Sequence, residues 1–256
     1  MGSVVQSLWI GDRLSVMEQL CISSFLRNGH AFHLYVYQET AGIPPGTVVL
    51  DGNRILPASR IFTYREHKTY AGFANFFRYK LLLEKGGWFV DADTVCLKPF
   101  NFRSKYVFSS EGIDGRQLVN LAAIKVPPGS EVMRYAWEAC EKMDPSELKW
   151  SQCGPTLLRQ AVEHCSLQRY IRHWNAFCPV HFSVWERLLD PSLTWNFTRE
   201  TYAIHLWNEL WRRAAMNKDA AYPTICLYEQ LKKRYLSKRR VSDVGAGVRV
   251  ANAEPA

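Results

Sequence analysis

Three structural signals follow one another in a short part of the chain. Residues 72–84 place their apolar side chains on one broad face of a helix. Gly86 and Gly87 supply the stop that favours a helix C-terminus, and the apolar strand WFV then leads directly into Asp91 and Asp93. Because ligands bind at the C-terminal ends of strands in α/β sheets, this order predicts an α/β domain with a ligand site at the two carboxylates.

The remaining patterns extend this unit into one large domain. At 256 residues and 47% hydrophobic content, the chain can bury a substantial core. Further predicted strands cover residues 4–10, 33–38, 48–50, 107–111, 118–126 and 201–207. Further predicted helices cover residues 15–26, 130–143, 153–165 and 228–240. We expect one α/β domain over residues 1–230, followed by a basic helix end and a disordered tail over residues 231–256.

The positive charge is concentrated at the C-terminus. The formal net charge is +8, and residues 231–256 hold seven Lys and Arg against two acidic residues. A nucleic-acid-binding protein should instead carry its basic residues along a face or groove of the fold. The basic run interleaves with Leu231, Tyr235 and Leu236, a pattern that can lie on an anionic membrane surface or form a solvated helix end.

The seven cysteines are odd in number and never form a C-x-x-C pair, so we expect reduced thiols and no zinc site. The first ten residues lack the pattern of a signal peptide, and no stretch approaches the roughly 20 apolar residues that span a bilayer. A cytoplasmic protein, peripheral at the inner face of the membrane, is the expectation.

Asp91 and Asp93 have the chemistry of a divalent cation site. Side chains at positions i and i+2 of an extended strand project the same way, so both carboxylates can face one cation while Ala92 points to the other side. Such a cation stabilises the negative charge that builds on a departing diphosphate. Taken alone, the pair is also compatible with a solvated turn at a strand end.

The segment FANFFRYKLLLEKGGWFVDADTVCLKPF resembles the donor-site signature of the D-x-D sugar transferases. This group includes α-1,4-galactosyl- and N-acetylglucosaminyltransferases, yeast mannosyltransferases and, more distantly, glucosylating clostridial toxins, and it is similar to glycosyltransferase family 32. Three further pieces agree in order: LWIG, CGPTLLRQA and HLWNELW. Together these pieces span about residues 8–211.

The resemblance implies a GT-A fold, which is a single Rossmann-like nucleotide-binding domain with a mixed central sheet and a helical C-terminal appendage. It also implies a metal-dependent retaining glycosyltransferase that uses Mn²⁺ or Mg²⁺ and a nucleotide sugar. The expected donor is UDP linked to galactose, N-acetylglucosamine or glucose, with GDP-mannose as the alternative. The expected acceptor is a glycan or glycolipid in polysaccharide biosynthesis.

The resemblance also assigns donor-binding roles. Trp9 is expected to stack on the nucleobase, with Ile10 beside it, and Arg78 is expected to reach the donor sugar or phosphate. Asn75 stands where many relatives carry Asp and should contact sugar hydroxyls, so this departure leaves the donor sugar open. Trp211 is expected to close over the donor.

The metal roles follow from the same motifs. Asp93 is the expected direct ligand, and Asp91 is expected to hold the ribose and share the metal. His205 is expected to approach the same ion, since neutral imidazole is an acceptable ligand for manganese. Asn208 is expected to complete the metal or phosphate shell. Together with Arg78, the two aspartates are the expected catalytic residues.

Three further residues have weaker assignments. Gly154 and Pro155 are implied to border the acceptor side, although Gly-Pro is also a common way to begin a helix. Glu111 either faces the reacting carbon or lies on the rim. The sequence does not decide between a front-side transfer and a double displacement. No residue must be a covalent nucleophile, so the front-side route is the hypothesis.

Four other functions share some of these features. A nucleotide-sugar hydrolase or a toxin-like protein glycosyltransferase would use the same donor site. A non-catalytic sugar-nucleotide binding module would keep that site without an acceptor face. A metal-dependent nuclease would need its basic charge around Asp91 and Asp93, whereas the sequence places that charge at the C-terminus.

Overall fold

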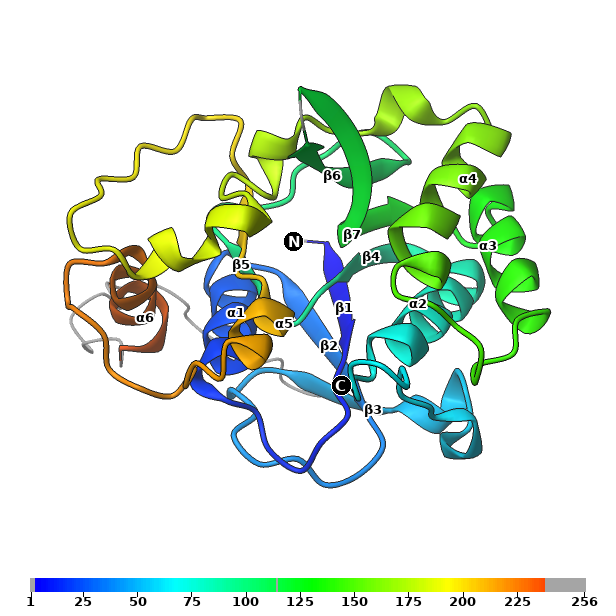
Figure 1. The fold of residues 1–256 in the computed structure, drawn as a ribbon, viewed down its shortest axis with the longest axis horizontal. Coiled ribbons are helices and arrows are strands. Elements are labelled where there is room, and N and C mark those ends of the chain that lie inside the picture. Colours follow the sequence, from blue (N-terminus) through cyan, green and yellow to red (C-terminus); the bar gives the residue numbers. More distant parts are fainter. Residues whose placement is uncertain (1–2, 114, 238–256) are drawn as a thin grey trace, which may run out of the picture.

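A six-stranded mixed sheet forms the centre of the molecule in the computed structural model, which describes residues 3–113 and 115–237 (Figure 1). The strands of this sheet, in chain order, are β1 (Val4–Leu8), β2 (Ala31–Val36), β3 (Val48–Asp51), β4 (Gly87–Val90), β6 (Val107–Ile113) and β7 (Arg116–Val126). Their order across the sheet is β3-β2-β1-β4-β7-β6. The first four are mutually parallel, whereas β7 runs antiparallel to both β4 and β6.

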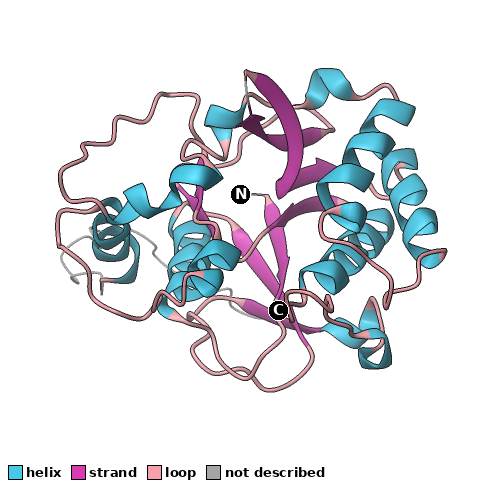
Figure 2. Cartoon of the chain, in the orientation of Figure 1, coloured by secondary structure: helices cyan, strands magenta, loops and turns pink. Residues whose placement is uncertain are grey.

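Helices cover both faces of this sheet (Figure 2). The described helices are α1 (Val16–Arg27), α2 (Ala71–Lys85), α3 (Glu131–Glu141), α4 (Leu157–His164), α5 (Asn208–Arg213) and α6 (Leu227–Leu236). In Figure 1, α2, α3 and α4 lie on one side of the strands, and α1, α5 and α6 lie on the other. The predicted class, an α/β domain with a mixed central sheet and a helical C-terminal appendage, is confirmed.

Strand β4 shows how one sheet supports two cores. Phe89 packs into the cluster that α2, α3 and α4 complete, while Trp88 and Val90 pack into the cluster on the α1 side. Successive side chains of a strand point to opposite faces, so a strand buried on both sides is apolar at every position. The run WFV is therefore explained by burial on both faces.

The glycine stop ahead of β4 behaves as predicted. Helix α2 ends at Lys85, and Gly86 follows with a φ of 60°. A β-carbon at Gly86 would collide with the backbone nitrogen of Pro128. Glycine is needed here because the left-handed backbone and the close approach both exclude a side chain.

Local geometry shortens several predicted elements. The predicted helix at residues 153–165 begins only at Leu157, because Gly154 has non-helical angles (φ −105°, ψ −120°) within the distorted turn Gln152–Thr156. The predicted strand at residues 201–207 narrows to β8 (Ala203–His205). This strand pairs antiparallel with β5 (Thr94–Cys96), a short strand that the sequence did not predict.

Helix α6 packs on the body of the domain. Leu231 and Tyr235 are buried in a cluster with residues of α1, and the Arg27 guanidinium donates a hydrogen bond to the Arg234 carbonyl at 2.6 Å. These two apolar side chains therefore face the protein interior, so they are not free to enter a membrane surface. The division predicted at residue 231 falls inside α6 and stays a prediction. The predicted tail beyond residue 237 lies outside the described residues.

Within residues 3–113 and 115–237, no helix has both the length and the apolar character needed to cross a bilayer.

Candidate active site

The two aspartates follow β4 at the edge of the sheet where the parallel strands end. β4 is held there by the Ser7 hydroxyl, which donates to the Val90 carbonyl at 2.8 Å. The Thr94 amide then donates to the Asp91 carbonyl at 3.0 Å, which closes a turn over Asp91, Ala92 and Asp93. The expectation of an extended strand at the D-x-D motif was therefore wrong. The turn nevertheless brings both carboxylates to one histidine.

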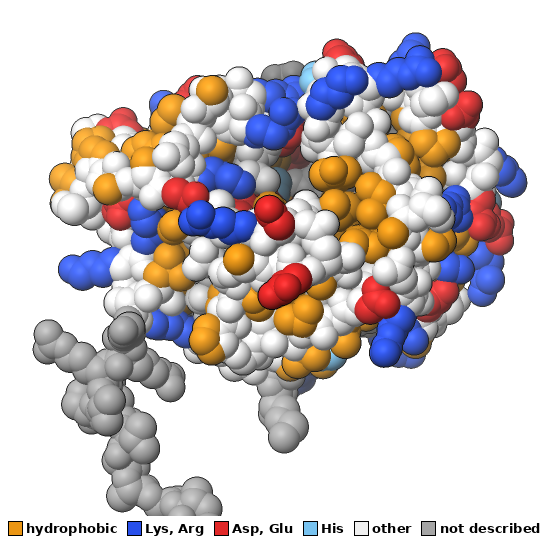
Figure 3. All heavy atoms as spheres, turned by 90° about the horizontal axis from the view of Figure 1, so that it is seen from below, with side chains coloured by type: hydrophobic (Ala, Val, Ile, Leu, Met, Phe, Trp, Pro, Cys, Tyr) orange, Lys and Arg blue, Asp and Glu red, His pale blue; other side chains and the backbone are white. Residues whose placement is uncertain are grey.

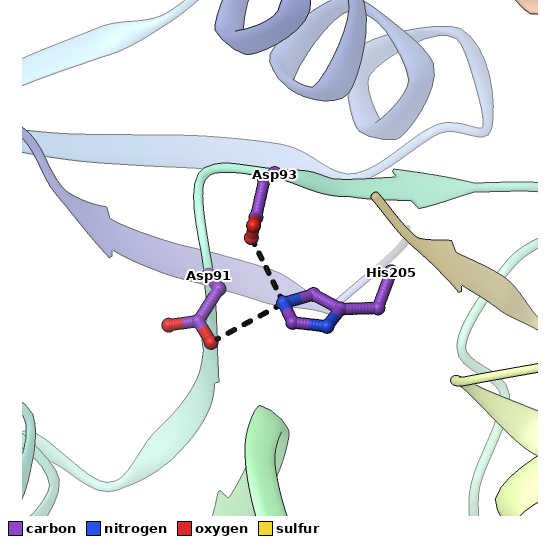
Figure 4. Close-up of side chains that lie close together, drawn as sticks. All are labelled: Asp91, Asp93 and His205. Atoms are coloured by element: carbon purple, nitrogen blue, oxygen red, sulfur yellow. Dashed lines mark ion pairs between the residues drawn. The ribbon is translucent and has the colours of Figure 1, made fainter. Parts of the chain in front are cut away.

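That histidine comes from β8. Thr94 pairs with His205 in the β5–β8 ladder, and the Leu206 amide donates to the Asp93 carbonyl at 2.9 Å. The His205 Nε2 atom lies 3.1 Å from Asp93 Oδ1 and 3.7 Å from Asp91 Oδ2 (Figure 4). One potential ligand atom from each of the three residues lies within 4.8 Å of the other two. This arrangement can hold a single cation.

The electrostatics of the cluster favour an ionised Asp93 beside His205. Burial opposes ionisation of Asp93, but the charge of His205 and hydrogen bonds from His205 and the Asn208 amide outweigh it, so the pKa of Asp93 is lowered. Burial likewise opposes protonation of His205, but the charges of Asp93 and Asp91 outweigh it and raise the pKa of His205. Two carboxylates around one imidazole form an environment that favours positive charge.

Asn208 completes this side of the cluster. Its backbone amide donates to Asp93 Oδ2 at 2.7 Å. Its side-chain Oδ1 atom is buried and has no hydrogen-bond partner among the described residues. Carboxylate oxygens, an amide oxygen and an imidazole nitrogen are all ligand types that manganese accepts. The residues present therefore fit a divalent cation.

Arg78 approaches the cluster from α2. Its guanidinium forms an ion pair with Asp91 and donates to Asn75 Oδ1 at 3.1 Å. It also lies 4.7 Å from the centre of the Phe89 ring, and only 3% of the side chain is exposed. Arg78 is therefore a buried residue of this site and not a surface residue of α2.

Asn75 is fixed between Arg78 and the distorted turn before α4. A β-carbon at Gly154 would lie 3.0 Å from Asn75 Nδ2, so glycine at this position lets the turn approach the amide. Pro155 lies in the same turn. The structure thus places the CGPT motif against the predicted donor-contacting residue.

Trp9 and Ile10 follow β1, the parallel neighbour of β4, and both are partly exposed. The Trp9 ring is oriented by a hydrogen bond from its Nε1 atom to the Arg13 carbonyl at 3.1 Å. Adjacent parallel strands end at the same edge of a sheet, so Trp9 and Asp91 lie on one side of the domain. The assignment of Trp9 to a nucleobase stays a prediction.

Trp211 differs from its predicted position. It is completely buried, donates from Nε1 to the Leu206 carbonyl at 2.8 Å, and packs against Trp185 and Tyr228. A ring without exposed surface has no face to offer the donor, so the expectation that Trp211 closes over the donor is corrected. Its role is in the core.

Trp207 is the aromatic residue beside the cluster, and the sequence reasoning missed it. Its ring centre lies 4.2 Å from that of His205, and its φ is 61°. A left-handed backbone is uncommon for a bulky residue and marks a constrained turn. This turn places the next amide, that of Asn208, on Asp93. The tryptophan of HLWNELW closest to the histidine was the available signal.

Glu111 lies on β6 and is partly buried. Burial raises the pKa of Glu111, and the charges of His205 and His181 oppose this rise. The carboxylate therefore lies within electrostatic reach of the cluster, whereas no hydrogen bond joins it to the cluster among the described residues.

Charged side chains of both signs lie on the face shown in Figure 3. Lys and Arg side chains are interspersed there with Asp and Glu side chains, and hydrophobic side chains gather beside a hollow. A nuclease that binds a polyanion along this face would need a continuous basic surface. The mixed pattern does not provide one.

Similar solved structures carry transferase titles. One is titled "PaToxG Glycosyltransferase"; it is 17% identical, the match covers 64% of this chain and 69% of that chain, and the TM-score is 0.49. Another is titled as the apo structure of the bifunctional glycosyltransferase WbbM; it is 11% identical, the match covers 92% of this chain and 52% of that chain, and the TM-score is 0.41. A comparison with curated proteins gave no match.

Two family models match the sequence. Residues 15–109 match the glycosyltransferase sugar-binding region containing the DXD motif, and this match includes Arg78, Asp91 and Asp93. Residues 141–235 match the alpha 1,4-glycosyltransferase conserved region, and this match includes His205 and Asn208. The two regions together contain every residue of the cluster described above. The chain therefore carries two regions that are characteristic of glycosyltransferases, the sugar-binding region with the DXD motif and the alpha 1,4-glycosyltransferase conserved region.

Proposed function

We propose that this glycosyltransferase moves a hexose or N-acetylhexosamine from a nucleotide sugar to a glycan or glycolipid, with retention of the anomeric configuration. The proposed donor carries UDP, and the proposed ion is Mn²⁺ or Mg²⁺. The observation that supports this proposal is the convergence of Asp91, Asp93 and His205 on one point, with the Arg78 guanidinium beside it. Such a site suits the diphosphate of a donor.

Each side chain has a distinct part in this proposal. Asp93, Asp91 and His205 would hold the divalent ion, and Asn208 Oδ1 is available as a further oxygen ligand. When bound, the ion supplies positive charge that stabilises a leaving diphosphate. Arg78 adds a fixed positive charge that stays positioned through the reaction, because Asn75 and Phe89 hold it from two sides.

The transfer exchanges one bond for another at the anomeric carbon. The acceptor hydroxyl oxygen forms a bond to that carbon, the bond from the carbon to the diphosphate oxygen breaks, and the bonding electron pair leaves with the diphosphate. The hydroxyl proton passes to the departing phosphate. We propose this front-side route because it needs no covalent nucleophile. A glycosyl adduct on the protein, detected by intact mass spectrometry after incubation with donor, would contradict it.

The experiment that tests the donor site is thermal unfolding of the wild type and of Asp93→Ala with UDP or GDP, each with and without Mn²⁺. A ligand at about 100 times its dissociation constant adds roughly 2.7 kcal/mol, and each kcal/mol shifts a domain of this size by about 2 to 4 °C. We expect UDP to raise the melting temperature of the wild type by about 5 to 10 °C, only with Mn²⁺ and only when Asp93 is present.

The controls separate the alternatives. Asp144→Ala removes an exposed carboxylate that is not part of the cluster, and should leave the UDP shift unchanged. A larger rise in melting temperature with GDP than with UDP would show that the donor base is guanine and not uracil. Binding of UDP with Mn²⁺ but no turnover with any acceptor would favour the binding module, and transfer to a protein would favour the toxin-like enzyme. No shift with either nucleotide would overturn the proposal.

A further inference from the structure

A cavity of 320 Å³ opens between β6 and the segment of residues 174–195. Its wall includes Gly112, Trp174, His181, Arg187 and Trp195. A second cavity, of 380 Å³, shares Gly112 and Trp174 with the first. A β-carbon at Gly112 would lie 2.9 Å from the Trp174 ring, so glycine at this point of β6 permits the indole to lie against the strand.

The first cavity lies one layer of residues from the metal-binding cluster. Val180 lines the cavity, and its carbonyl accepts a hydrogen bond from Trp207 Nε1 at 2.8 Å. The Trp207 ring packs on His205. Cys178 also lines the cavity, and the preceding residue, Phe177, accepts a hydrogen bond from the His205 amide at 3.0 Å. A molecule in the cavity is therefore close to a donor held at the cluster.

The wall of this cavity combines aromatic surface with hydrogen-bond donors. Trp174 and Trp195 contribute indole rings, and flat apolar rings are suited to the C–H faces of a pyranose. The Ser183 amide donates to His181 Nδ1 at 3.2 Å, so the proton of the neutral ring is on Nε2. Both His181 Nε2 and Trp195 Nε1 are buried without a partner among the described residues. Because these two atoms have almost no accessible surface, the wall offers a ligand its indole rings and the Arg187 guanidinium rather than these donors.

The charged groups of the two walls are of one sign. Arg187 lines the first cavity and Arg116 lines the second. Neither guanidinium forms an ion pair with a carboxylate within the described part of the chain, and no described lining residue is an Asp or Glu. Arginine pairs with planar anions through two parallel hydrogen bonds. These guanidinium groups favour a ligand that carries negative charge, against the opposing charges of Glu111, which acts on His181, and Asp190, which acts on Arg187.

We propose that these two neighbouring cavities bind the acceptor, and that the acceptor is an acidic saccharide. Its terminal pyranose would pack on Trp174 and Trp195, and its carboxylate or phosphate would pair with Arg187 or Arg116. This inference rests on the proposed function, since it places the sugar beside a nucleotide-sugar donor. It adds the charge class of the acceptor, which the family regions leave open.

The test compares matched sugars by saturation-transfer NMR on the full chain, with UDP and Mn²⁺ present. The three sugars are methyl β-D-glucoside, methyl β-D-glucuronide and methyl β-D-glucoside 6-phosphate. We expect at least one acidic sugar to bind about 10-fold more tightly than the neutral one, which corresponds to about 1.4 kcal/mol. Preference for the glucuronide indicates a uronic acid acceptor, and preference for the phosphate indicates a sugar phosphate.

Variants assign the preference to this site. Arg187→Gln combined with Arg116→Gln should abolish the 10-fold preference while leaving the Mn²⁺-dependent UDP shift intact, and Trp195→Ala should weaken all three sugars. Arg199→Gln, an exposed arginine outside both walls, is the matched control and should change nothing. Equal binding of acidic and neutral sugars overturns the inference, as does a preference that survives loss of both arginines.

The experiments distinguish a failure of the acidic-acceptor proposal from a failure of the proposed transferase function. If UDP with Mn²⁺ stabilises the protein but acidic sugars show no preference, the charge class is wrong and the donor site stands. If UDP never stabilises the protein and acidic sugars still bind through the two arginines, the cavity stands as a saccharide site and the transferase proposal falls.

Discussion

His205 and Asp93 meet at the end of the short β5–β8 ladder, with His205 Nε2 3.1 Å from Asp93 Oδ1. The ladder fixes the backbone of both partners, because Thr94 pairs with His205 and the Leu206 amide binds the Asp93 carbonyl. The two side chains are therefore held in contact before any ligand arrives. Because the imidazole of His205 gains or loses a proton while it contacts Asp93, the net charge of the site depends on pH.

We expect the stability of the metal-free protein to depend on His205 in one direction. The pKa of His205 is raised in the folded state, so its stabilising effect is complete below the unfolded value of about 6.5 and is lost as the pH rises through the folded value. The free energy of unfolding of the wild type, measured with EDTA, should exceed that of His205→Gln most at low pH. His164→Gln, at an exposed position of α4, should show no such trend.

Mn²⁺ should produce the opposite dependence. A cation needs the neutral imidazole, so the stabilisation by Mn²⁺ should grow as the pH rises through the same range. Melting temperatures across a pH series, with and without Mn²⁺, measure both trends. A Mn²⁺ effect that is equally large at low pH would show that His205 is not a ligand.

Removing Arg78 should reveal how strongly it is coupled to Asp91. Arg78→Met leaves the Asp91 carboxylate without its guanidinium, and we expect a loss of about 3 kcal/mol in unfolding free energy, which is typical of a broken buried pair. Adding Asp91→Asn should recover part of that loss, because the uncompensated charge is gone. Lys80→Met breaks the exposed pair with Glu84 on the same helix and should cost less than about 0.5 kcal/mol. Additive losses in a denaturant-based double-mutant cycle would exclude the coupling.

Trp9 and Trp211 should respond differently to replacement by leucine. Trp211→Leu removes a fully buried ring and should cost about 3 kcal/mol of stability, while the Mn²⁺-dependent shift with UDP persists in the folded variant. Trp9→Leu, at a partly exposed position, should cost less stability and weaken UDP binding. Calorimetric titration with UDP and Mn²⁺ measures the affinity. Unchanged affinity in Trp9→Leu would remove Trp9 from the nucleobase site.

Truncation at two points should separate the basic segment from the core. Deleting residues 231–256 removes the buried side chains of Leu231 and Tyr235, so we expect a destabilised protein. Deleting residues 238–256 keeps α6 and should leave the UDP shift unchanged, while binding to anionic phosphatidylserine vesicles falls because Lys and Arg residues are lost. Vesicle co-sedimentation at two salt concentrations tests this, and unchanged sedimentation would exclude the predicted membrane contact.

The order of elements around the aspartates was predictable because it is local. Periodicity over α2, the glycine stop at Gly86 and the apolar strand before Asp91 all act within one short segment. The turn at Asp91 was not predictable, because it is closed by the Thr94 amide as the chain leaves β4 to pair with β8. Strands of three residues carry too little sequence pattern to be recognised.

The sequence by itself determined the chemistry of this protein: a helix, a glycine stop and a buried strand that ends in two carboxylates. Only the tertiary structure decided which distant residues meet them. Asn208 lies 115 residues from Asp93 and contacts it through a backbone amide. Every residue except proline has such an amide, so the residue type does not predict this contact. The tertiary structure also decided that Trp207, and not Trp211, lies beside the cluster. The left-handed backbone at Trp207 places its ring against His205, and the packing of that ring stabilises the unfavourable conformation.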